Sequence, residues 1–364
     1  MTIIIFILIL GVLVFVHELG HFLVAKKAGI KVDEFSIGFP PRLLSKKIGE
    51  TLYSVNIVPL GGYVKIYGEN PDDESTTGPD SRRSFVNKNR GVQALVLSAG
   101  IASNIIFAWL LISIGLMIGL PTPVDSTNSA NISNAHVVVA DVVTKSPASK
   151  ADIRLGDSIL SLQSGTDKTV EVLNSDDVGQ FVSSHGGKEI TVTLLRGTET
   201  LETKVTPSDN IIQNKPAIGI SMATVGILKY SFLGSFLESV KITWNLTKLI
   251  AEGIGSFFYN VFTFKADISQ VSGPVGIAGM VGEAQRLGLV YLLTFTALIS
   301  LNLAIINIVP FPALDGGRLL FVAIEAIIRR RINPKIQNWV NGVGFAILIL
   351  LMIVVTYNDI VKLF

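Results

Sequence analysis

Residues 1–27 read MTIIIFILILGVLVFVHELGHFLVAKK, and this stretch determines how the rest of the chain is interpreted. The apolar run over residues 1–25 carries no charge before His17 and is followed directly by Lys26 and Lys27. A secretory signal peptide would instead have a basic start, a shorter apolar core and a small-residue cleavage site. Roughly 24 helical residues at about 1.5 Å each can span a bilayer with some tilt. We therefore predict a retained transmembrane helix whose basic end faces the cytoplasm.

The sequence His17-Glu18-Leu19-Gly20-His21 places two histidines one helical turn apart within this apolar run. Residues at i and i+4 lie on one helix face, so both imidazoles can hold one metal ion, and Glu18 can reach a metal-bound water as general base. The alternative is a chance pattern or a hydrogen-bonded core pair. Ionisable groups in membrane-length apolar sequence are costly and usually functional, which favours a metalloprotease-type site.

The composition indicates a membrane protein of more than one domain. Of the 364 residues, 49% are hydrophobic and only 16% are charged, so charge is confined to the segments between spans. The formal net charge of +2 is too small to indicate a nucleic-acid partner. The chain has no cysteine, so a zinc site must use histidine and carboxylate ligands.

Four transmembrane helices are predicted from the alternation of apolar and charged segments. Residues 26–90 are rich in lysine and arginine, which predicts a cytoplasmic loop. Residues 91–120 carry no charge and form the second span, in which we expect Asn104 to serve packing or hydrogen bonding rather than catalysis. The third span lies in residues 287–336, and the fourth span and the C-terminus lie in residues 337–364.

The cytoplasmic loop contains two β-prone runs, Leu52–Val58 and Tyr63–Tyr67, joined by Pro59-Leu60-Gly61-Gly62. This pattern predicts a membrane-associated β-hairpin that is unusually apolar for a cytoplasmic loop. The hairpin could simply cover the cytoplasmic mouth of the site. Alternatively, one of its strands could dip towards the site and pair with an unwound substrate.

Residues 307–317, NIVPFPALDGG, contain two prolines and two glycines that would break a helix at membrane depth. Broken backbone is tolerated there only where it is buried in protein or lines a cavity. Asp315 is then a carboxylate within the membrane, which needs a partner. Its natural partner is the metal held by His17 and His21.

Residues 121–210 are polar and strand-rich, and they predict an α+β domain on the extracytoplasmic side. Within them, Ser146-Pro147-Ala148 and the run RLGDSIL at residues 154–160 resemble stretches of a PDZ domain, a fold that binds extended peptides by strand addition. We expect His136 and His185 of this segment to be surface residues.

Residues 211–286 are predicted to form an extracytoplasmic region that contains a long amphipathic helix from about residue 229 to residue 263. Charged and polar residues recur at helical spacing along this segment, from Glu238 to Glu252. We expect this stripe to be solvated while the helix lies along the membrane or braces the PDZ-like domain.

The HExxH-type segment, the PDZ-like insert and the Asn-x-x-Pro-x-Pro-x-Leu-Asp-Gly run together resemble the site-2 protease family, zinc metalloproteases that cut substrates within the membrane. The likeness covers essentially the whole chain and is greatest for the bacterial branch of RseP or RasP type, peptidase family M50B. It implies a polytopic α-helical protein of the bacterial inner membrane whose third transmembrane helix is broken near Asp315. The basic loops place both termini and the PDZ-like domain outside the cytoplasm, with the active site in the membrane towards the cytoplasmic side.

Site residues follow from the same resemblance. It implies that His17, His21 and Asp315 bind Zn²⁺ and that Glu18 is the catalytic base. The substrate-binding residues that we predict are one asparagine, two prolines and three hairpin positions: Asn307, Pro310, Pro312, Leu60, Gly61 and Gly62.

The expected substrates are single-span membrane proteins in the lipid bilayer, pre-trimmed by another protease, such as anti-sigma factors or remnant signal peptides. The PDZ-like domain could grip a new carboxyl terminus or exclude bulky substrates. A non-enzymatic scaffold is the rival class, but it would lack Glu18, a histidine or Asp315, and all are present. A transporter could also contain broken helices, but the two halves of the chain show no repeat.

Overall fold

The computed structural model describes residues 1–70, 73–123, 132–165, 167–172, 174–197, 199–212, 215–263, 265 and 271–362. Contacts divide the chain into two compact units. The first, called the membrane unit below, comprises Met1–Ser113 and Phe236–Phe364. The second, called the sheet unit, comprises Ile114–Ser235.

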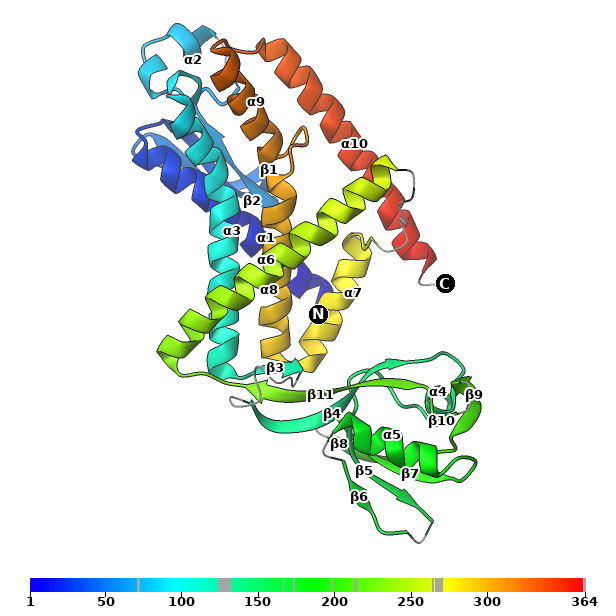
Figure 1. Cartoon of the computed structure of the whole chain (residues 1–364). Helices are drawn as coiled ribbons and strands as arrows, with labels where there is room; N and C mark the ends of the chain where they lie inside the picture. The colour runs from blue at the N-terminus through cyan, green and yellow to red at the C-terminus, as the bar shows by residue number, and fades with distance from the viewer. Residues whose placement is uncertain are drawn as a thin grey trace. The chain divides into compact units, whose positions relative to one another are not determined.

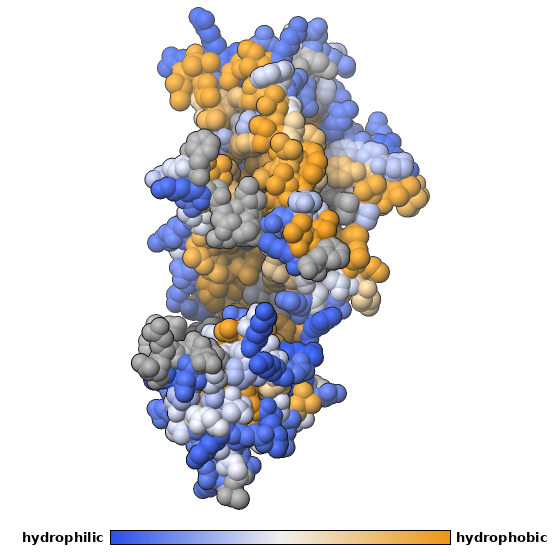
Figure 2. All heavy atoms as spheres, turned by 90° about the vertical axis from the view of Figure 1, so that its right-hand side faces the viewer, coloured by the Kyte–Doolittle hydropathy of each residue, from blue (hydrophilic) through white to orange (hydrophobic). Residues whose placement is uncertain are grey.

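Four of the described helices are long and apolar enough to cross a membrane, in agreement with the four predicted spans. They are α1 (Thr2–Lys27), α3 (Arg90–Ile118), α8 (Leu289–Ile308) and α10 (Pro334–Val361) (Figure 1). Many of their exposed side chains are leucine, isoleucine and valine, and Figure 2 shows broad hydrophobic areas over the membrane unit. Such a surface suits contact with lipid chains.

The remaining helices of the membrane unit are shorter or carry more charge. They are α2 (Asp73–Thr77), the 3₁₀ turns η1 (Ser81–Arg83) and η2 (Phe85–Asn87), α6 (Phe232–Phe262), α7 (Pro274–Leu287) and α9 (Asp315–Ile328). The third span, α8, ends at Ile308, and α9 begins at Asp315 after a short non-helical connection that contains both prolines.

The long helix α6 is present as predicted, but the buried residues on its packed face are small and polar. Ser239 and Thr243 are buried, and the Ser239 hydroxyl lies 2.7 Å from that of Ser113 on α3. Leu237 and Trp244 are 72% and 69% exposed. Small polar residues in the contact and large apolar residues outside are typical of helices that pack within lipid.

The predicted hairpin was wrong in its pairing. The observed strands are β1 (Val32–Ile48) and β2 (Thr51–Ile66), and the turn between them contains Gly49, whose φ is 63°. Phe35 of β1 pairs with both Tyr53 and Val64, so the first part of β1 lies between the two runs that were expected to pair with each other. Pro59 to Gly62 therefore bend a continuous strand instead of forming its turn.

The sheet unit contains one antiparallel sheet, whose strand order is β3-β11-β4-β5-β7-β8, and β6 pairs with β5. Its strands are β3 (Leu120–Pro123), β4 (Ile132–Val142), β5 (Ser158–Ser164), β6 (Val170–Glu171), β7 (Ile190–Arg196), β8 (Glu199–Val205) and β11 (Ile220–Leu228). A separate pair is formed by β9 (Ser208–Ile212) and β10 (Lys215–Ala217), and the helices are α4 (Pro147–Lys150) and α5 (Ser175–Ser184).

The boundary predicted at residue 210 was too early, because β11 pairs with β4 and β3 and thus belongs to the sheet. The core of the unit is almost entirely aliphatic. Val137 of β4, Ile159 of β5 and Val192 of β7 are each at most 1% exposed and belong to one cluster. Helix α5 packs on this cluster through Val178 and begins with a capping box at Asn174.

Candidate metal centre

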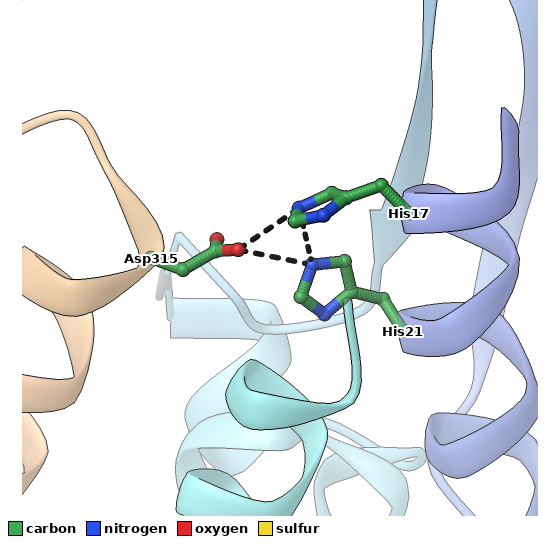
Figure 3. A group of neighbouring side chains, drawn as sticks. All are labelled: His17, His21 and Asp315. Carbon is green, nitrogen blue, oxygen red and sulfur yellow. Dashed lines mark hydrogen bonds and ion pairs between the residues drawn. The ribbon is translucent and has the colours of Figure 1, made fainter. Parts of the chain in front are cut away.

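Two neighbouring turns of α1 and the first residue of α9 bring three possible metal ligands together. His17 Nε2 lies 3.0 Å from Asp315 Oδ2, His21 Nε2 lies 3.3 Å from the same oxygen, and the two Nε2 atoms are 3.2 Å apart. Figure 3 shows both imidazoles pointing from α1 towards the carboxylate. The described residues contain one group of histidine and carboxylate side chains whose ligand atoms are close enough to share a metal ion, and it consists of these three residues.

The triangle formed by these three atoms fits a tetrahedral zinc ion. Ligand atoms on bonds of roughly 2.0–2.1 Å with tetrahedral angles lie about 3.3–3.4 Å apart. The observed separations of 3.0, 3.2 and 3.3 Å are close to that value. Two nitrogens and one carboxylate oxygen are also a ligand set that zinc uses in catalytic sites, where a fourth position stays open.

Asp315 reaches α1 because the connection before α9 folds back tightly on the first turn of that helix. A Cβ atom on Gly316 would overlap the carbonyl oxygens of Ile308 and Val309, and one on Gly317 would overlap that of Phe311. Glycine at both positions thus permits the close approach that the chain makes here.

Helix α3 approaches α1 just as closely. A Cβ atom on Gly20 would overlap the carbonyl oxygen of Ala99 and the hydroxyl of Ser103. A Cβ atom on Gly100 would overlap His21 Nε2 and lie 2.8 Å from His17 Nε2. The absence of a side chain at Gly20 therefore lets α3 approach α1, and its absence at Gly100 leaves the room that the two imidazoles occupy.

Glu18 lies on α1 between the two histidines and is half-buried. Its Oε2 accepts a hydrogen bond of 3.0 Å from the backbone N–H of Val64 in β2. The N–H of Tyr67, three residues later, points the other way and donates to the carbonyl of Lys31. Because backbone groups alternate along a strand, Gly62, Val64 and Ile66 share the strand edge that faces α1.

The ring nitrogens that do not face Asp315 also contact protein. His21 Nδ1 donates to the carbonyl of Val96 at 2.8 Å, and His17 Nδ1 lies 3.3 Å from the side-chain amide of Asn104. The sequence singled out Asn104 only as a packing or hydrogen-bonding residue. Its position four residues after Gly100 is the signal that would have directed it to the site.

The other predicted site residues lie in two places. Asn307 is in the last turn of α8, whereas Pro310 and Pro312 are in the connection to α9. Pro312 packs against α10, where a Cβ atom on Gly344 would lie 2.8 Å from the Pro312 carbonyl oxygen. This contact gives Pro312 a structural part in holding the connection.

The three hairpin positions all belong to β2. Gly61 and Gly62 lie close to β1, since Cβ atoms there would fall 2.6 Å from the Phe39 ring and from the carbonyl oxygen of Ser36. The side chain of Leu60 lies outside the described structure. Thus the glycines shape the bend in β2, which positions the strand edge beside Glu18.

Two ion pairs near the site connect the helices and the strand that form it. Neither pair was predicted from the sequence. Arg318, one turn after Asp315 on α9, forms an ion pair with Glu69 just beyond β2. Glu325, which is 6% exposed, pairs with Arg90 at the start of α3 at 2.8 Å. These pairs connect α9 to the strand that contacts Glu18 and to the helix that contacts both histidines.

Sequence comparison places this arrangement in a known group of enzymes. The model of peptidase family M50 matches residues 5–351. The chain belongs to peptidase family M50. The M50 chain is 30% identical to the zinc metalloprotease RasP of Geobacillus kaustophilus over 441 aligned residues, which cover 100% of this chain and 98% of that protein. It is 31% identical to the regulator of sigma-W protease RasP of Bacillus subtilis over 440 residues, 100% of this chain and 99% of that protein.

A solved PDZ domain of an SdrC-like protein from Listeria monocytogenes also matches 25% of the M50 chain and 90% of its own, with 17% identity. Its TM-score is 0.22, so this likeness carries no weight for the fold. The family and its relatives make this chain a zinc metalloprotease and a multi-pass bacterial membrane protein.

Proposed function

We propose that this M50 metalloprotease hydrolyses peptide bonds within the transmembrane segments of single-span membrane proteins, with His17, His21 and Asp315 as the zinc ligands. The main support for this proposal is the spacing of the three ligand atoms of His17, His21 and Asp315, which lie 3.0 to 3.3 Å from one another. All three residues belong to helices of the membrane unit, and α1 is itself a candidate span. Peptide hydrolysis at this depth requires a substrate that also lies in the membrane.

The protein side chains divide the chemistry between them. Zinc held by His17, His21 and Asp315 would supply a Lewis acid for the scissile carbonyl and for a water molecule. Glu18, between the two ligands on α1, takes the proton of that water and passes it to the leaving amine. Asn307 orients the peptide or stabilises the oxyanion from the end of α8.

The edge of β2 supplies backbone groups for an unwound substrate. A transmembrane helix hides its amides in i to i−4 hydrogen bonds, so the scissile segment must be extended before attack. In the described structure the sheet consists of β1 and β2 only, which leaves the edge of Gly62, Val64 and Ile66 without a partner strand. A substrate strand added to this edge would lie next to Glu18. The bend in β2 at Gly61 and Gly62 thereby contributes to substrate binding.

The orientation in the bacterial plasma membrane follows from the distribution of basic residues. Lysine and arginine are concentrated in residues 26–90 and in Arg329-Arg330-Arg331, both of which face the cytoplasm in this proposal. Both termini and the sheet unit are then extracytoplasmic, and the metal centre lies towards the cytoplasmic end of α1.

The substrates are proteins already trimmed by another protease, such as anti-sigma factors or remnant signal peptides. The Bacillus subtilis relative is named a regulator of sigma-W protease, which supports the first class. The PDZ-like sheet unit acts as a gate that excludes untrimmed ectodomains, and recruitment of a new carboxyl terminus is the alternative.

The test of the site pairs zinc content with cleavage. Wild type, Glu18→Gln and His17→Ala are purified in detergent, and bound zinc and cleavage of a single-span substrate are measured. We expect zinc in wild type and in Glu18→Gln, cleavage only by wild type, and neither in His17→Ala. His185→Ala in the sheet unit is the matched control and should retain both. Full zinc binding by His17→Ala would refute the ligand set.

The gate is tested by excising the sheet. Leu120 and Leu228 are paired across β3 and β11, so a short Gly-Ser linker from Gly119 to Lys229 can replace residues 120–228. A gate predicts that untrimmed substrates become cleavable, whereas recruitment predicts that cleavage of trimmed substrates is lost. Retained zinc in the shortened protein controls for folding of the membrane unit.

A further inference from the structure

One face of α3 is directed at the metal centre through three residues at a spacing of four. Val96 accepts a hydrogen bond of 2.8 Å from His21 Nδ1, and Gly100 makes room for both imidazoles. Asn104 places its side-chain amide 3.3 Å from His17 Nδ1. Residues at i, i+4 and i+8 form a single stripe, so one helix contacts the outer nitrogen of each histidine.

The side chain of Asn104 is fully buried, and one of its polar atoms has no partner. Its relative exposure is 0%, and its Oδ1 accepts no hydrogen bond from any described residue. Its Nδ2 is the atom that faces His17 Nδ1. A buried acceptor without a donor is unfavourable, and native proteins rarely retain one. The oxygen and nitrogen of an asparagine amide exchange places by a half-turn of the side chain, at no cost in shape.

The chemistry of a histidine ligand determines which orientation the amide takes. If Nε2 of a neutral His17 binds the metal, its proton resides on Nδ1, which then needs an acceptor. The half-turn places Oδ1 against that proton and satisfies both the ring and the orphaned oxygen. The backbone at this point is also fixed, because the buried Ser300 of α8 donates to the Asn104 carbonyl at 2.8 Å.

We propose that Asn104 is a positioning residue of the metal centre, whose side-chain oxygen accepts the Nδ1 proton of His17 and thereby fixes Nε2 as the ligand atom. The inference rests on the ligand set proposed above. Val96 does the same for His21 with a backbone carbonyl, and α3 thus sets the tautomer of both histidine ligands. A packing role alone does not account for an amide at a fully buried position, since leucine has the same branched arrangement of heavy atoms and no polar atom to satisfy.

The test compares Asn104→Leu, which keeps the branched shape and removes the acceptor, with Asn104→Asp, which keeps an oxygen at the same place. The zinc dissociation constant is measured on the full-length protein in detergent by competition with a chelator. Loss of a hydrogen-bond partner of a metal-binding histidine weakens affinity by about 10- to 100-fold. We expect that loss in Asn104→Leu, with Asn104→Asp within about 3-fold of wild type. Ser113→Ala is the matched control, since Ser113 is also fully buried on α3 but hydrogen-bonds to Ser239.

Nitrogen NMR of histidine-labelled, zinc-loaded protein provides a readout that packing does not move. Wild-type His17 should carry its proton on Nδ1, and the signal of that proton should shift in Asn104→Leu but much less in Ser113→Ala. A His17 Nδ1 without a proton in wild type would overturn the inference even if Asn104→Leu does not fold. Unchanged zinc affinity in Asn104→Leu, or equal losses in Asn104→Leu and Asn104→Asp, would overturn the role of Asn104 while the ligand set stands. Full zinc affinity in His17→Ala would instead overturn the ligand set and this inference with it.

Discussion

Both units of the molecule bury apolar side chains, but the membrane unit also buries polar side chains of the metal centre. The sheet unit has a core of valine, isoleucine and leucine, as in a small soluble domain. The membrane unit buries His17, His21, Asn104 and Glu325, while leucines and isoleucines cover much of its exterior. Lipid chains solvate apolar side chains well, so apolar residues on the outside of the membrane unit are not unfavourable. Polar groups are unfavourable in contact with lipid and therefore lie in the interior of the unit. A buried polar residue of the membrane unit that contacts the metal centre is therefore a guide to function, whereas burial in the sheet unit mainly reflects stability.

The largest expected effect separates two aspartates of the membrane unit. Asp315→Asn removes a proposed zinc ligand, and we expect bound zinc to be lost and cleavage to fall by about 1,000-fold or more. Asp359 is also buried, but its Oδ2 accepts the N–H of Gly276 and caps the N-terminus of α7. Asp359→Asn should retain zinc and activity, because asparagine also caps helices well. Zinc analysis with a cleavage assay checks both variants. Equal losses in the two variants would show that the loss in Asp315→Asn does not report the removal of a zinc ligand.

The next effect concerns the space between α3 and α1. A methyl group at Gly100 would overlap His21 Nε2, so Gly100→Ala must displace an imidazole. Misplacement of a catalytic group by about 1 Å can lower activity roughly 100-fold, and we expect a loss of that order in cleavage. The exposed Gly342 of α10 has open space around its Cα, which makes Gly342→Ala the matched control. Wild-type cleavage by Gly100→Ala would show that α3 does not confine the histidines.

The sheet unit should respond to core truncation without any change at the metal centre. Leu194 of β7 is 1% exposed, and Leu194→Ala should destabilise this unit by about 2–5 kcal/mol. Leu160 of β5 is 37% exposed, so Leu160→Ala should cost much less. Hydrogen exchange of the sheet amides measures the loss, and zinc titration of the same samples should give wild-type affinity. Weaker zinc binding in Leu194→Ala would mean that the two units do not act as independently as their cores suggest.

The sequence predicted the residues whose burial in a membrane is energetically unfavourable, because such residues are retained there mainly for function. Glu18 and the histidines stand out in an apolar helix, and Asp315 was assigned to the same metal because a carboxylate at membrane depth needs a partner. The structure brings His17 and Asp315 to 3.0 Å although they are 298 residues apart in the chain. Asn104 carries no charge, and its position four residues after Gly100 was the one signal in the sequence that set it apart from a packing residue.

Strand pairing was less accessible because it depends on contacts between distant residues. Pro59 to Gly62 have a strong turn composition, yet the turn forms at Gly49, and Val32–Ile37 enters between the two runs. Strand β11 was missed because its partners β3 and β4 begin about 90 or more residues earlier. The composition of a segment predicts its own conformation. The pairing of β1 with β2 and of β11 with β3 and β4 depends instead on residues far away in the sequence.

The smallest expected effect lies at the tip of the hairpin, outside both the metal centre and the sheet unit. Arg83 and Lys26 donate to the Glu50 carboxylate at 2.7 and 2.6 Å, and this lowers its pKa from the ordinary 4.5 to about 2. A carboxyl whose pKa is lower in the folded state contributes stability that is complete above about pH 4.5 and is lost as the pH falls towards 2.

Glu50→Gln should therefore lower the unfolding free energy by about 1 kcal/mol at pH 7, because the pairs are partly solvated, and the difference should shrink below pH 4.5. Thermal unfolding between pH 3 and pH 7 measures it, with Glu74→Gln on the exposed helix α2 as control. Zinc affinity should stay at the wild-type level throughout, since neither Arg83 nor Glu50 contacts the ligand residues in the described structure. A pH-independent loss of stability would show that shape, and not charge, holds the hairpin tip against the end of α1.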